Sequence, residues 1–591
     1  MTEDNRNLLL AFTLSMLVLF GWFYFVDHPR MEADRARIET QTEPAKPAPG
    51  AGGNPAASDI PRPDGAPGGS LPGSEPVMAG ALSREEVLAK SPRIPIDNGQ
   101  VHGSISLTGG RLDDLTLISY RETVSPSSPE IVLLSPAGSS KPYYAEYGFV
   151  AVGAAPPRLP DYQTRWTGDV NQVLRPGNPV TLSWDNGEGL RFTRTYAVDD
   201  HFLFTLIDRV ENTGGLTVSL MPYGLISRHY TPQVGGYFIL HEGLLGVLNG
   251  TLNEITYKNI HKEAPARVQS TGGWLGITDK YWLVTLIPDQ NAAFTGGFSY
   301  KPLSGHDRYQ ADYLREAISL APGESREVTS RLFAGAKKVE VIDAYASQYA
   351  ITLFDRAIDW GWFYFLTKPM FTVIEWFYGL TGNFGVAIIL LTLSVKAAFF
   401  PLANTSYVAM SKMKKVQPMM MEIREKFADD KMRQQQEMME LYRREKVNPI
   451  SGCLPMLVQI PVFFSLYKVL FVTIEMRHAP FFGWINDLAA PDPTTLFNLF
   501  GLLPWTPPGF LMIGIWPILM GISMWMQQRL NPPPADPVQE KIFLWMPVFF
   551  TFLLGTFPAG LVIYWTVNNV LSIIQQTVIM KREGAEVSFR L

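Results

Sequence analysis

The sequence predicts a multi-domain membrane protein in which an α-helical core with six transmembrane spans carries a large all-β domain. Long apolar runs occur near the N-terminus and in the last third of the 591 residues, whereas the middle of the chain is polar and alternates with a period of two. A formal net charge of -5 and a hydrophobic content of 46% would by themselves suit a soluble protein, so the prediction depends on how the apolar residues are distributed. The chain is also too long for a single hydrophobic core.

The first 27 residues contain an apolar run, 8–26, that closes on four consecutive aromatic residues. Such clusters are typical of the membrane–water interface. The run is longer than the apolar part of a secretory signal, and no small-x-small cleavage motif follows it directly, so residues 1–27 are expected to form an uncleaved signal anchor. Residues 28–82 are rich in Pro, Ala and Gly and are expected to be a disordered linker.

Residues 83–346 consist of short alternating runs separated by Gly, Asp, Asn and Pro, for example the run at 179–184 followed by Asp-Asn-Gly. This pattern predicts a large antiparallel β-sandwich outside the cytoplasm. If the domain were an enzyme, His229, His241 and Glu242 would be the candidate active-site residues. Because the sequence has no HExxH metal motif, nucleophile elbow or phosphate-binding glycine loop, we expect a binding or scaffolding domain with no cofactor and no metal.

Residues 347–381 combine charges at helical spacing with many aromatic residues, and a break is expected at Lys368-Pro369. These features predict an amphipathic helix that lies in the membrane interface, and a helix packed on the soluble domain is the alternative.

The span predicted over residues 383–404 contains one cation, Lys396, about five residues before Pro401. A lysine inside the bilayer is costly unless it is hydrated, paired or able to reach the headgroups. The other long apolar runs have no Asp or Glu in their interiors, so we expect a wet cavity open toward the side where this helix ends. Snorkelling of Lys396 to the near headgroups is the alternative.

Residues 405–447 are strongly charged and predict a hairpin of two helices that folds back at 428–430, with Pro418 kinking or interrupting the first helix. Their excess of Lys and Arg predicts a cytoplasmic location. The hairpin is also rich in methionine, which can form an adaptable surface for varied partners or simply fill a helix–helix seam. The candidate capture residues are Met413, Met419, Met420, Met421, Met438 and Met439.

Four further apolar runs, at 454–474, 510–526, 542–557 and 561–580, complete the six spans and, with the hairpin, the core over 382–580. Basic residues beyond the last run, in the tail 581–591, place both termini in the cytoplasm. Lys468 lies near the outer end of its span and is expected to snorkel or to meet Glu475 or Glu375.

Several stretches in this region resemble the YidC insertases of bacteria and their mitochondrial Oxa and chloroplast Albino relatives. The matching stretches are Gly-Asn-Phe-Gly at 382–385, Asn-Pro-Ile-Ser-Gly-Cys-Leu-Pro at 448–455, Ala-Pro-Phe-Phe-Gly-Trp at 479–484 and Phe-Pro-Ala-Gly-Leu-Val-Ile-Tyr-Trp at 557–565. They cover residues 350–580 in the right order. With the anchor and the β-domain, the whole chain resembles the Gram-negative form of the family.

The resemblance implies a five-helix core with a hydrophilic groove open to cytoplasm and lipid, and a periplasmic β-domain with the supersandwich fold of sugar mutarotases. The residues that it assigns to the substrate path are Lys396, Thr392, Gln459, Tyr564, Trp565 and Asn568. The best-known members have Arg at the position of Lys396, and Lys keeps the charge without the planar fork that grips a carboxylate.

The function implied by the resemblance is that of an inner-membrane insertase that inserts and helps to fold nascent membrane proteins, alone or with the Sec translocon. Membrane lipids are further partners, and the ribosome and the signal recognition particle pathway are left open, with no nucleic acid bound except through the ribosome. The chain is expected not to be an enzyme, and it has no Walker motif for nucleotide hydrolysis. A transporter or channel, and a membrane-tethered sugar-processing or sugar-binding protein, are the alternatives.

Overall fold

The computed structural model describes residues 82–584, apart from 154–155, 234–239, 263, 304–305, 429, 446–453, 502, 504, 506, 508–511 and 532–536. The expected signal anchor, almost all of the expected linker, the single cysteine Cys453 and residues 585–591 of the tail lie outside the described residues. All of the described residues belong to one structural unit, Ser58–Leu591.

The predicted β-sandwich is confirmed: within the described residues, two antiparallel sheets enclose one hydrophobic core. A short helix, α3 (Arg84–Leu88), precedes the sheets. The ten-stranded sheet has the order β1 (Arg93–Asp97), β2 (Val101–Ser106), β3 (Leu112–Arg121), β5 (Tyr143–Val152), β9 (Val218–Arg228), β16 (His306–Arg315), β15 (Ala293–Leu303) and β12 (Val268–Thr271), with β4 (Glu130–Leu134) beside β3 and β17 (Ile318–Leu320) beside β9. The eight-stranded sheet has the order β11 (Thr251–Thr256), β10 (Gly243–Leu248), β13 (Trp274–Thr278), β14 (Trp282–Ile287), β18 (Ser325–Ala336), β8 (Leu203–Asn212), β7 (Leu190–Val198) and β6 (Val180–Asp185), and the short helix α4 (Tyr257–Ile260) follows β11.

Alternation along the strands decides which side chains enter the core. In β5, Tyr143 and Tyr147 pack in the main core, whereas Tyr144 belongs to a small second cluster on the opposite face of the sheet. The predicted turn between β6 and β7 forms as well, with Gly187 at φ +72° where a residue with a Cβ would be strained.

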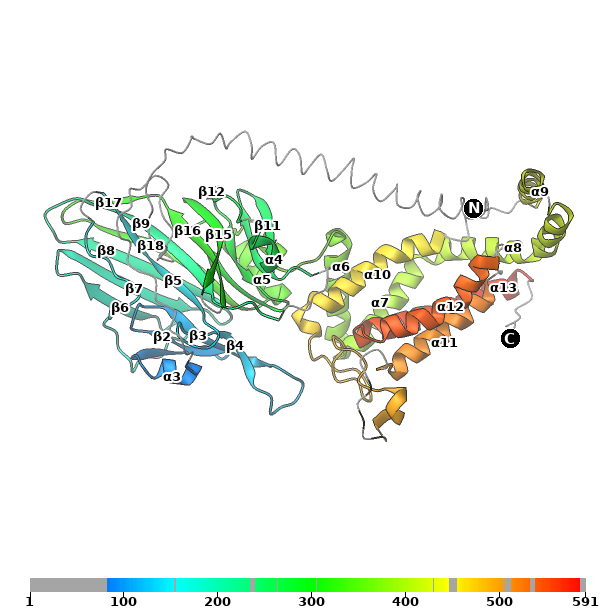
Figure 1. Ribbon diagram of the computed structural model, residues 1–591, viewed down its shortest axis with the longest axis horizontal. Coiled ribbons are helices and arrows are strands. Elements are labelled where there is room, and N and C mark those ends of the chain that lie inside the picture. Colours follow the sequence, from blue (N-terminus) through cyan, green and yellow to red (C-terminus); the bar gives the residue numbers. More distant parts are fainter. Residues whose placement is uncertain are drawn as a thin grey trace. The chain divides into compact units, whose positions relative to one another are not determined.

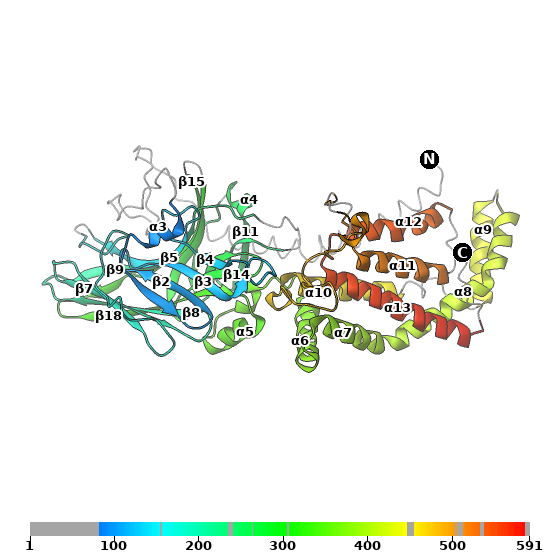
Figure 2. The same ribbon diagram turned by 90° about the horizontal axis from the view of Figure 1, so that it is seen from below.

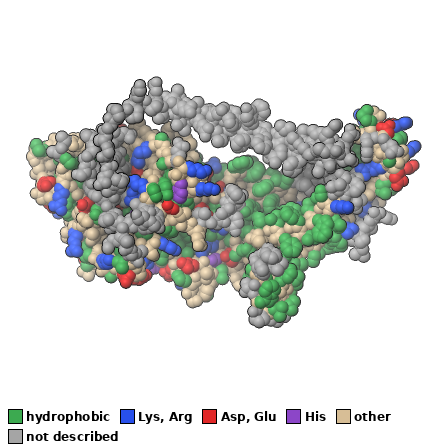
Figure 3. All heavy atoms as spheres, viewed as in Figure 1, with side chains coloured by type: hydrophobic (Ala, Val, Ile, Leu, Met, Phe, Trp, Pro, Cys, Tyr) green, Lys and Arg blue, Asp and Glu red, His purple; other side chains and the backbone are tan. Residues whose placement is uncertain are grey.

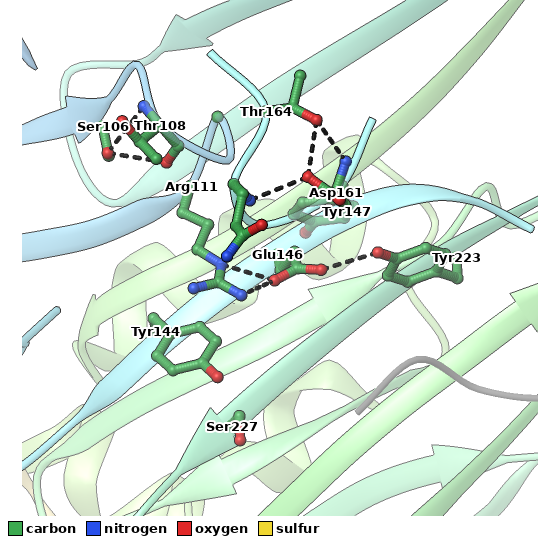
Figure 4. A network of polar contacts seen from close by, with 12 residues as sticks. Ser106, Thr108, Arg111, Tyr144, Glu146, Tyr147, Asp161, Thr164, Tyr223 and Ser227 are labelled. Carbon is green, nitrogen blue, oxygen red and sulfur yellow. Dashed lines mark hydrogen bonds and ion pairs between the residues drawn. The ribbon is translucent and has the colours of Figure 1, made fainter. Parts of the chain in front are cut away.

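The sandwich also buries charged side chains, and two of them, Arg194 and Arg111, are paired with carboxylates. Arg194 donates from Nε and Nη2 to the two carboxylate oxygens of Asp208, at 2.6 and 3.1 Å. On the other face of the ten-stranded sheet, Arg111 donates to Glu146 at 2.6 Å, and the Tyr223 hydroxyl donates to the second oxygen of the same carboxylate at 2.8 Å (Figure 4). A buried charge is tolerated when it is paired and hydrogen-bonded in this way.

The sandwich continues into α5 (Val339–Gln348), the 3₁₀ turn η2 (Phe354–Ala357) and α6 (Tyr364–Thr381). The break expected at Lys368-Pro369 is wrong, because α6 runs through Pro369; near the start of a helix proline disrupts few hydrogen bonds. Phe371 is buried, whereas Phe365 is 73% exposed and Trp362, just before the helix, is 87% exposed. The location of α6 in the membrane interface stays a prediction.

The rest of the described chain is helical (Figures 1 and 2). Helices α11 and α12 pack together, and α13 packs against α7, α8, α10 and α11. The bounds are α7 (Phe384–Ala398), α8 (Phe400–Lys426), α9 (Lys431–Arg444), α10 (Leu454–Val472), α11 (Ile515–Leu530), α12 (Pro537–Leu554) and α13 (Ala559–Arg582), with the 3₁₀ turns η4 (Ile474–Met476) and η5 (Leu496–Gly501) between α10 and α11.

The helix that contains Lys396 ends earlier than predicted. The chain bends by 67° between α7 and α8, so residues 400–404 start the next helix and Lys396 lies in the last turn of α7. Pro401, in the first turn of α8, explains the break, since proline has no N–H to donate to the carbonyl one turn back in α7 and its ring crowds that carbonyl. Helix α8 then continues through Pro418, so of the two expected effects, a kink or an interruption, the interruption is wrong and the kink stays a prediction.

Judged by length and hydropathy alone, no helix in the described part of the chain would cross a bilayer by itself, and only the bent pair α7 and α8 would do so jointly. Shorter apolar helices are formed by Gln459–Val472 and Lys541–Leu554.

The expected partners of Lys468 are also wrong. Its ammonium group lies 2.8 Å from Oδ1 of Asp359, which precedes α6 and also accepts hydrogen bonds from the backbone N–H groups of Gly361 and His241. Asp359 is more than 100 residues away in sequence, so local spacing could not reveal this pair.

Glu475, in η4, instead joins α10 to the start of α5. One carboxylate oxygen accepts the backbone N–H of Val339 at 3.0 Å, and the other has no hydrogen-bond partner among the described residues. The pKa of Glu475 is raised to about 7, chiefly by burial and also by nearby Glu375, while the Val339 hydrogen bond and Lys338 act against the rise. Glu475 therefore keeps its proton up to about neutral pH.

Replacing Glu475 by Gln is expected to stabilise this junction above pH 7. Between the ordinary carboxyl pKa and about 7 the folded state holds a proton that the unfolded state has lost, so the stability of the wild type falls as the pH rises through this window, by up to about 3 kcal/mol. Hydrogen exchange at the α5 amides, corrected for the intrinsic pH effect, should speed up with pH in the wild type and not in Glu475→Gln. Exposed Glu340, in α5, supplies the control: Glu340→Gln should keep the wild-type pH dependence. The same pH dependence in Glu475→Gln would contradict the assignment.

Candidate functional site

A cavity of about 40 Å³ lies where α7, α8 and α10 meet, large enough for water. Its lining is mixed, with Lys396 and the polar groups of Tyr407 and Gln459 among aliphatic and aromatic side chains. The lining residues are Val395, Lys396, Phe399, Leu402, Ala403, Tyr407, Gln459 and Val462. The cavity exists because the chain bends at Phe399, which turns the start of α8 away from the axis of α7.

The ammonium group of Lys396 is held by a hydroxyl group. Its Nζ donates to Ser572 Oγ on α13 at 2.7 Å, and Ser572 Oγ in turn donates to the backbone carbonyl of Asn568 at 2.7 Å. Tyr407 lies within hydrogen-bonding reach of the same hydroxyl. No carboxylate of the described residues forms an ion pair with Lys396. Neutral groups orient the ammonium group without neutralising its charge. The charge can therefore still attract an anionic or polar group that enters the cavity.

Gln459 connects the cavity to the middle of α13. Its side-chain amide donates to the hydroxyl of Tyr564, which is buried. The next residue, Trp565, packs edge to face on Phe463 of α10, with ring centroids 4.6 Å apart, and also contacts Phe550 of α12. These contacts fix α10 and α12 against α13 beside the cavity.

The predicted groove residues are thus divided into three groups. Lys396 and Gln459 line the cavity, while Tyr564 and Asn568 lie behind it and are linked to it by hydrogen bonds. Thr392 is buried and donates to the carbonyl of Ile388 in its own helix at 2.7 Å, so its hydroxyl is already satisfied.

Several buried polar atoms near the same ends of the helices have no hydrogen-bond partner among the described residues. They belong to α8, α11 and α13, which pack together. Buried polar groups are stable when water or another polar group pairs with them, so this part of the bundle can accept polar material. The atoms are Ser411 Oγ, Gln528 Nε2, Gln575 Nε2, Gln576 Oε1 and Thr577 Oγ1.

Sequence reasoning missed Ser572 and Tyr407. A signal for Ser572 exists, because Tyr564, Asn568, Ser572 and Gln576 recur every four residues and therefore share one face of α13. All four are buried, as expected for the face that meets the rest of the bundle. Tyr407 gave no such signal, since residues from 405 onward were expected to belong to the charged hairpin.

The hairpin forms from α8 and α9, with Leu441 buried between them. Of the candidate capture residues, Met421 and Met439 are exposed, whereas Met413, Met419, Met420 and Met438 are partly buried. This mixture of exposed and partly buried side chains does not separate a helix seam from an adaptable outer surface, so the role of the methionines stays a prediction.

The residues considered for an enzyme site in the sandwich lie in different sheets. His229 follows β9 of the ten-stranded sheet and meets the hydroxyls of Ser227 and Tyr144 at 3.0 and 3.4 Å. His241 and Glu242 directly precede β10 of the eight-stranded sheet, where Glu242 accepts the backbone N–H of Lys280. Among the described residues, no group of three or more His, Cys, Asp or Glu side chains is placed to hold a metal ion.

Comparison with known proteins gives the same two-part division. The family model described as the YidC periplasmic domain matches residues 93–373, and the model described as the 60Kd inner membrane protein matches residues 376–586. The membrane protein insertase YidC of Bradyrhizobium diazoefficiens is 52% identical over 602 residues, covering 99% of this chain and 98% of that relative. Those of Beijerinckia indica and Brucella suis are 55% and 53% identical, each covering 99% of this chain and 97% of the relative.

Solved structures give weaker similarity. A crystal structure described as an active YidC insertase with its first transmembrane domain resolved is 17% identical and has a TM-score of 0.35, covering 82% of this chain and 92% of that chain. A galactose mutarotase-like protein from Lactobacillus casei has a TM-score of 0.29 at 12% identity, covering 41% of this chain and 99% of that chain. Because both scores are below 0.5, the assignment depends on the sequence relatives.

Proposed function

Because the chain belongs to the YidC family of membrane protein insertases, we propose that the cavity beside Lys396 is where a hydrophilic segment of a nascent membrane protein enters the membrane. The protein is an inner-membrane insertase whose substrates are nascent membrane proteins. The observation that carries the proposal about the site is the Lys396 ammonium, held by Ser572 at a cavity of mixed lining, with no carboxylate partner among the described residues.

The main energetic cost of moving a hydrophilic segment into the membrane is the loss of its hydration. A polar segment that leaves water for hydrocarbon loses its hydrogen bonds, and the cost is several kcal/mol for each unpaired group or charge. In the cavity, Lys396 offers a positive charge and Gln459 offers an amide. The unpaired polar atoms of α8, α11 and α13 belong to residues that do not line the cavity, and they offer further partners elsewhere in the bundle. The apolar segment that follows can then move into lipid, driven by its own transfer free energy.

We propose that α7, α10, α11, α12 and α13 cross the membrane, with a sixth span at residues 8–26 and both termini in the cytoplasm. Helix α7 is short: its 15 residues extend about 22 Å, less than the ~30 Å of a typical hydrocarbon core. A short span favours local thinning of the bilayer, which shortens the distance that a polar segment must travel. The groove would open toward cytoplasm and lipid, since Lys396 is in the last turn of α7, next to the charged helices α8 and α9.

The hairpin is proposed to capture the nascent chain before it enters the cavity, through Met413, Met419, Met420, Met421, Met438 and Met439. Thioether side chains adapt to apolar segments of different shape. The Sec translocon and the ribosome are proposed partners at the membrane and at the cytoplasmic face.

Site-specific photocrosslinking to stalled nascent chains tests the site. A photoreactive residue at Gln459 should crosslink to the hydrophilic segment of a substrate, whereas one at Ile574, which is exposed on α13, should not. Equal yields at the two positions, or yields that do not change when the nascent chain is released, would contradict the proposed path.

The alternatives make different predictions. A channel should pass solutes through proteoliposomes that contain the protein alone, so solute flux above that of empty liposomes would favour it. A sugar-processing enzyme should need His229, His241 or Glu242, whereas the insertase should keep much of its activity when all three are replaced.

A further inference from the structure

The connection between α10 and α11 is unusually apolar for a segment outside the helices. No charged side chain occurs between Asp492 and Arg529, and only the last part of this interval belongs to α11. We use the term apolar loop for its described large side chains, which are Leu496, Phe497, Leu499, Phe500, Leu503 and Trp505.

These side chains are turned outward. Leu499 and Phe500 are 49% and 50% exposed, and the other members of the apolar loop are exposed to a similar degree. In the space-filling view, hydrophobic side chains cover the protrusion that corresponds to the orange connection below α11 (Figure 3). Soluble proteins rarely leave such a contiguous apolar surface in water, so the loop has a partner.

The backbone of the loop has two residues in a left-handed conformation, and hydrogen bonds within the loop hold it. Leu499 and Phe500 have φ of +51° and +59°, a left-handed conformation that is strained for large apolar residues. The conformation is held by hydrogen bonds within the loop: Phe500 N–H donates to Thr495 O at 2.9 Å, and Leu503 N–H donates to Asn498 O at 3.0 Å. The indole N–H of Trp505 is also paired, with the carbonyl of Phe497 at 3.2 Å. Each polar group that is paired within the loop costs less to remove from water than an unpaired one.

The base of the loop is fixed to the helices. Asp492 is buried and accepts hydrogen bonds from the indole of Trp484 and the backbone of Thr494 on one oxygen, and from the backbone of Trp516, at the start of α11, on the other. The N–H of Ala559, at the start of α13, donates to Ala490 O at 2.7 Å. The loop therefore sits firmly at the end of the bundle where α11 and α13 begin.

We propose that the apolar loop inserts into the lipid leaflet at this end of the bundle and anchors the insertase there. Lipid is favoured over a protein partner because the loop has no charge to specify one, and because exposed apolar side chains continue from it along α11, such as Leu519 and Ile522. The proposal depends on the proposed function only in that the bundle lies in a membrane, and with the topology given above the leaflet is the outer one.

Quenching of a fluorophore by nitroxide-labelled lipids tests the anchor without any substrate. The full chain, with Cys453→Ala to remove the only native cysteine, carries Phe500→Cys labelled with an environment-sensitive dye in phospholipid vesicles. The dye should show a blue-shifted emission and lose most of it when the lipids carry nitroxides. The matched control is Leu216→Cys, an 81% exposed leucine of the β-domain. Quenching no greater than at Leu216 would overturn the proposal.

A second variant separates lipid contact from folding of the loop. Asn tolerates left-handed backbone better than Leu, so Leu496→Asn with Leu499→Asn should keep the loop folded while removing two apolar contacts. Quenching at residue 500 should then fall toward the Leu216 level, and unchanged quenching would contradict the anchor. A dye response that appears only with stalled nascent chains would assign the surface to a protein and also overturn the proposal. Insertion assayed on the same vesicles reports separately on the proposed function.

Discussion

Replacing Lys396 by Glu is expected to reduce insertion of substrates that do not use the Sec translocon by about tenfold or more. The substitution reverses the charge that the cavity presents to an entering segment, and the carboxylate would also lie near Ser572 and the carbonyl of Asn568, where it repels the carbonyl oxygen. At an effective dielectric constant of about 20, two unit charges about 4 Å apart interact by about 4 kcal/mol. Reversing even part of such an interaction changes the free energy by more than a tenfold change in insertion requires. Insertion into inverted membrane vesicles measures the effect.

Three control variants identify the origin of the effect. Lys396→Arg keeps the charge and should keep most of the activity, whereas Lys396→Met keeps the length and apolar stem and should fall between Arg and Glu. Ser572→Ala removes the hydroxyl that orients the ammonium and should cost less than loss of the charge. Equal activity of the Glu and Arg variants would mean that Lys396 merely snorkels to the headgroups.

The two-part fold could be predicted because its signals are local. Period-two alternation and turn residues such as those at 185–187 are properties of neighbouring residues, and they suffice for a sandwich. Long apolar runs likewise predict helices. The order of strands in the two sheets was not predictable, since β5 pairs with β9 across more than 60 residues.

The errors around the site have two physical causes, one local and one long-range. The break at Phe399 depends on how a proline at the start of α8 competes with continuation of α7, and an apolar run does not report that competition. The pair of Lys468 with Asp359 and the bond from Lys396 to Ser572 join residues more than 100 positions apart. A single sequence indicates that a buried charge needs a partner, and only the fold decides which partner it meets.

Replacing Arg194 by Met is expected to destabilise the β-domain by about 3–5 kcal/mol, because Asp208 would remain as a buried charge without its partner. The backbone carbonyl of Tyr147, which accepts from Arg194 Nη2 at 2.8 Å, would also lose its donor. Unfolding of the domain in the full-length protein, followed by pulse proteolysis in denaturant, measures the change.

The neighbouring strand supplies a matched control for the Arg194 prediction. Arg209, exposed on β8, pairs with Glu211 at 2.9 Å, and Arg209→Met should cost no more than about 1 kcal/mol, as for other surface pairs. Arg194→Met combined with Asp208→Leu should recover most of the loss, since no unpaired charge remains. A small effect of Arg194→Met alone would contradict the burial of the pair. If the sandwich is a scaffold and insertion occurs beside Lys396, the Arg194→Met protein should still insert substrates under conditions in which its β-domain is largely unfolded, whereas an enzyme sited in the sandwich would lose its activity along with the domain.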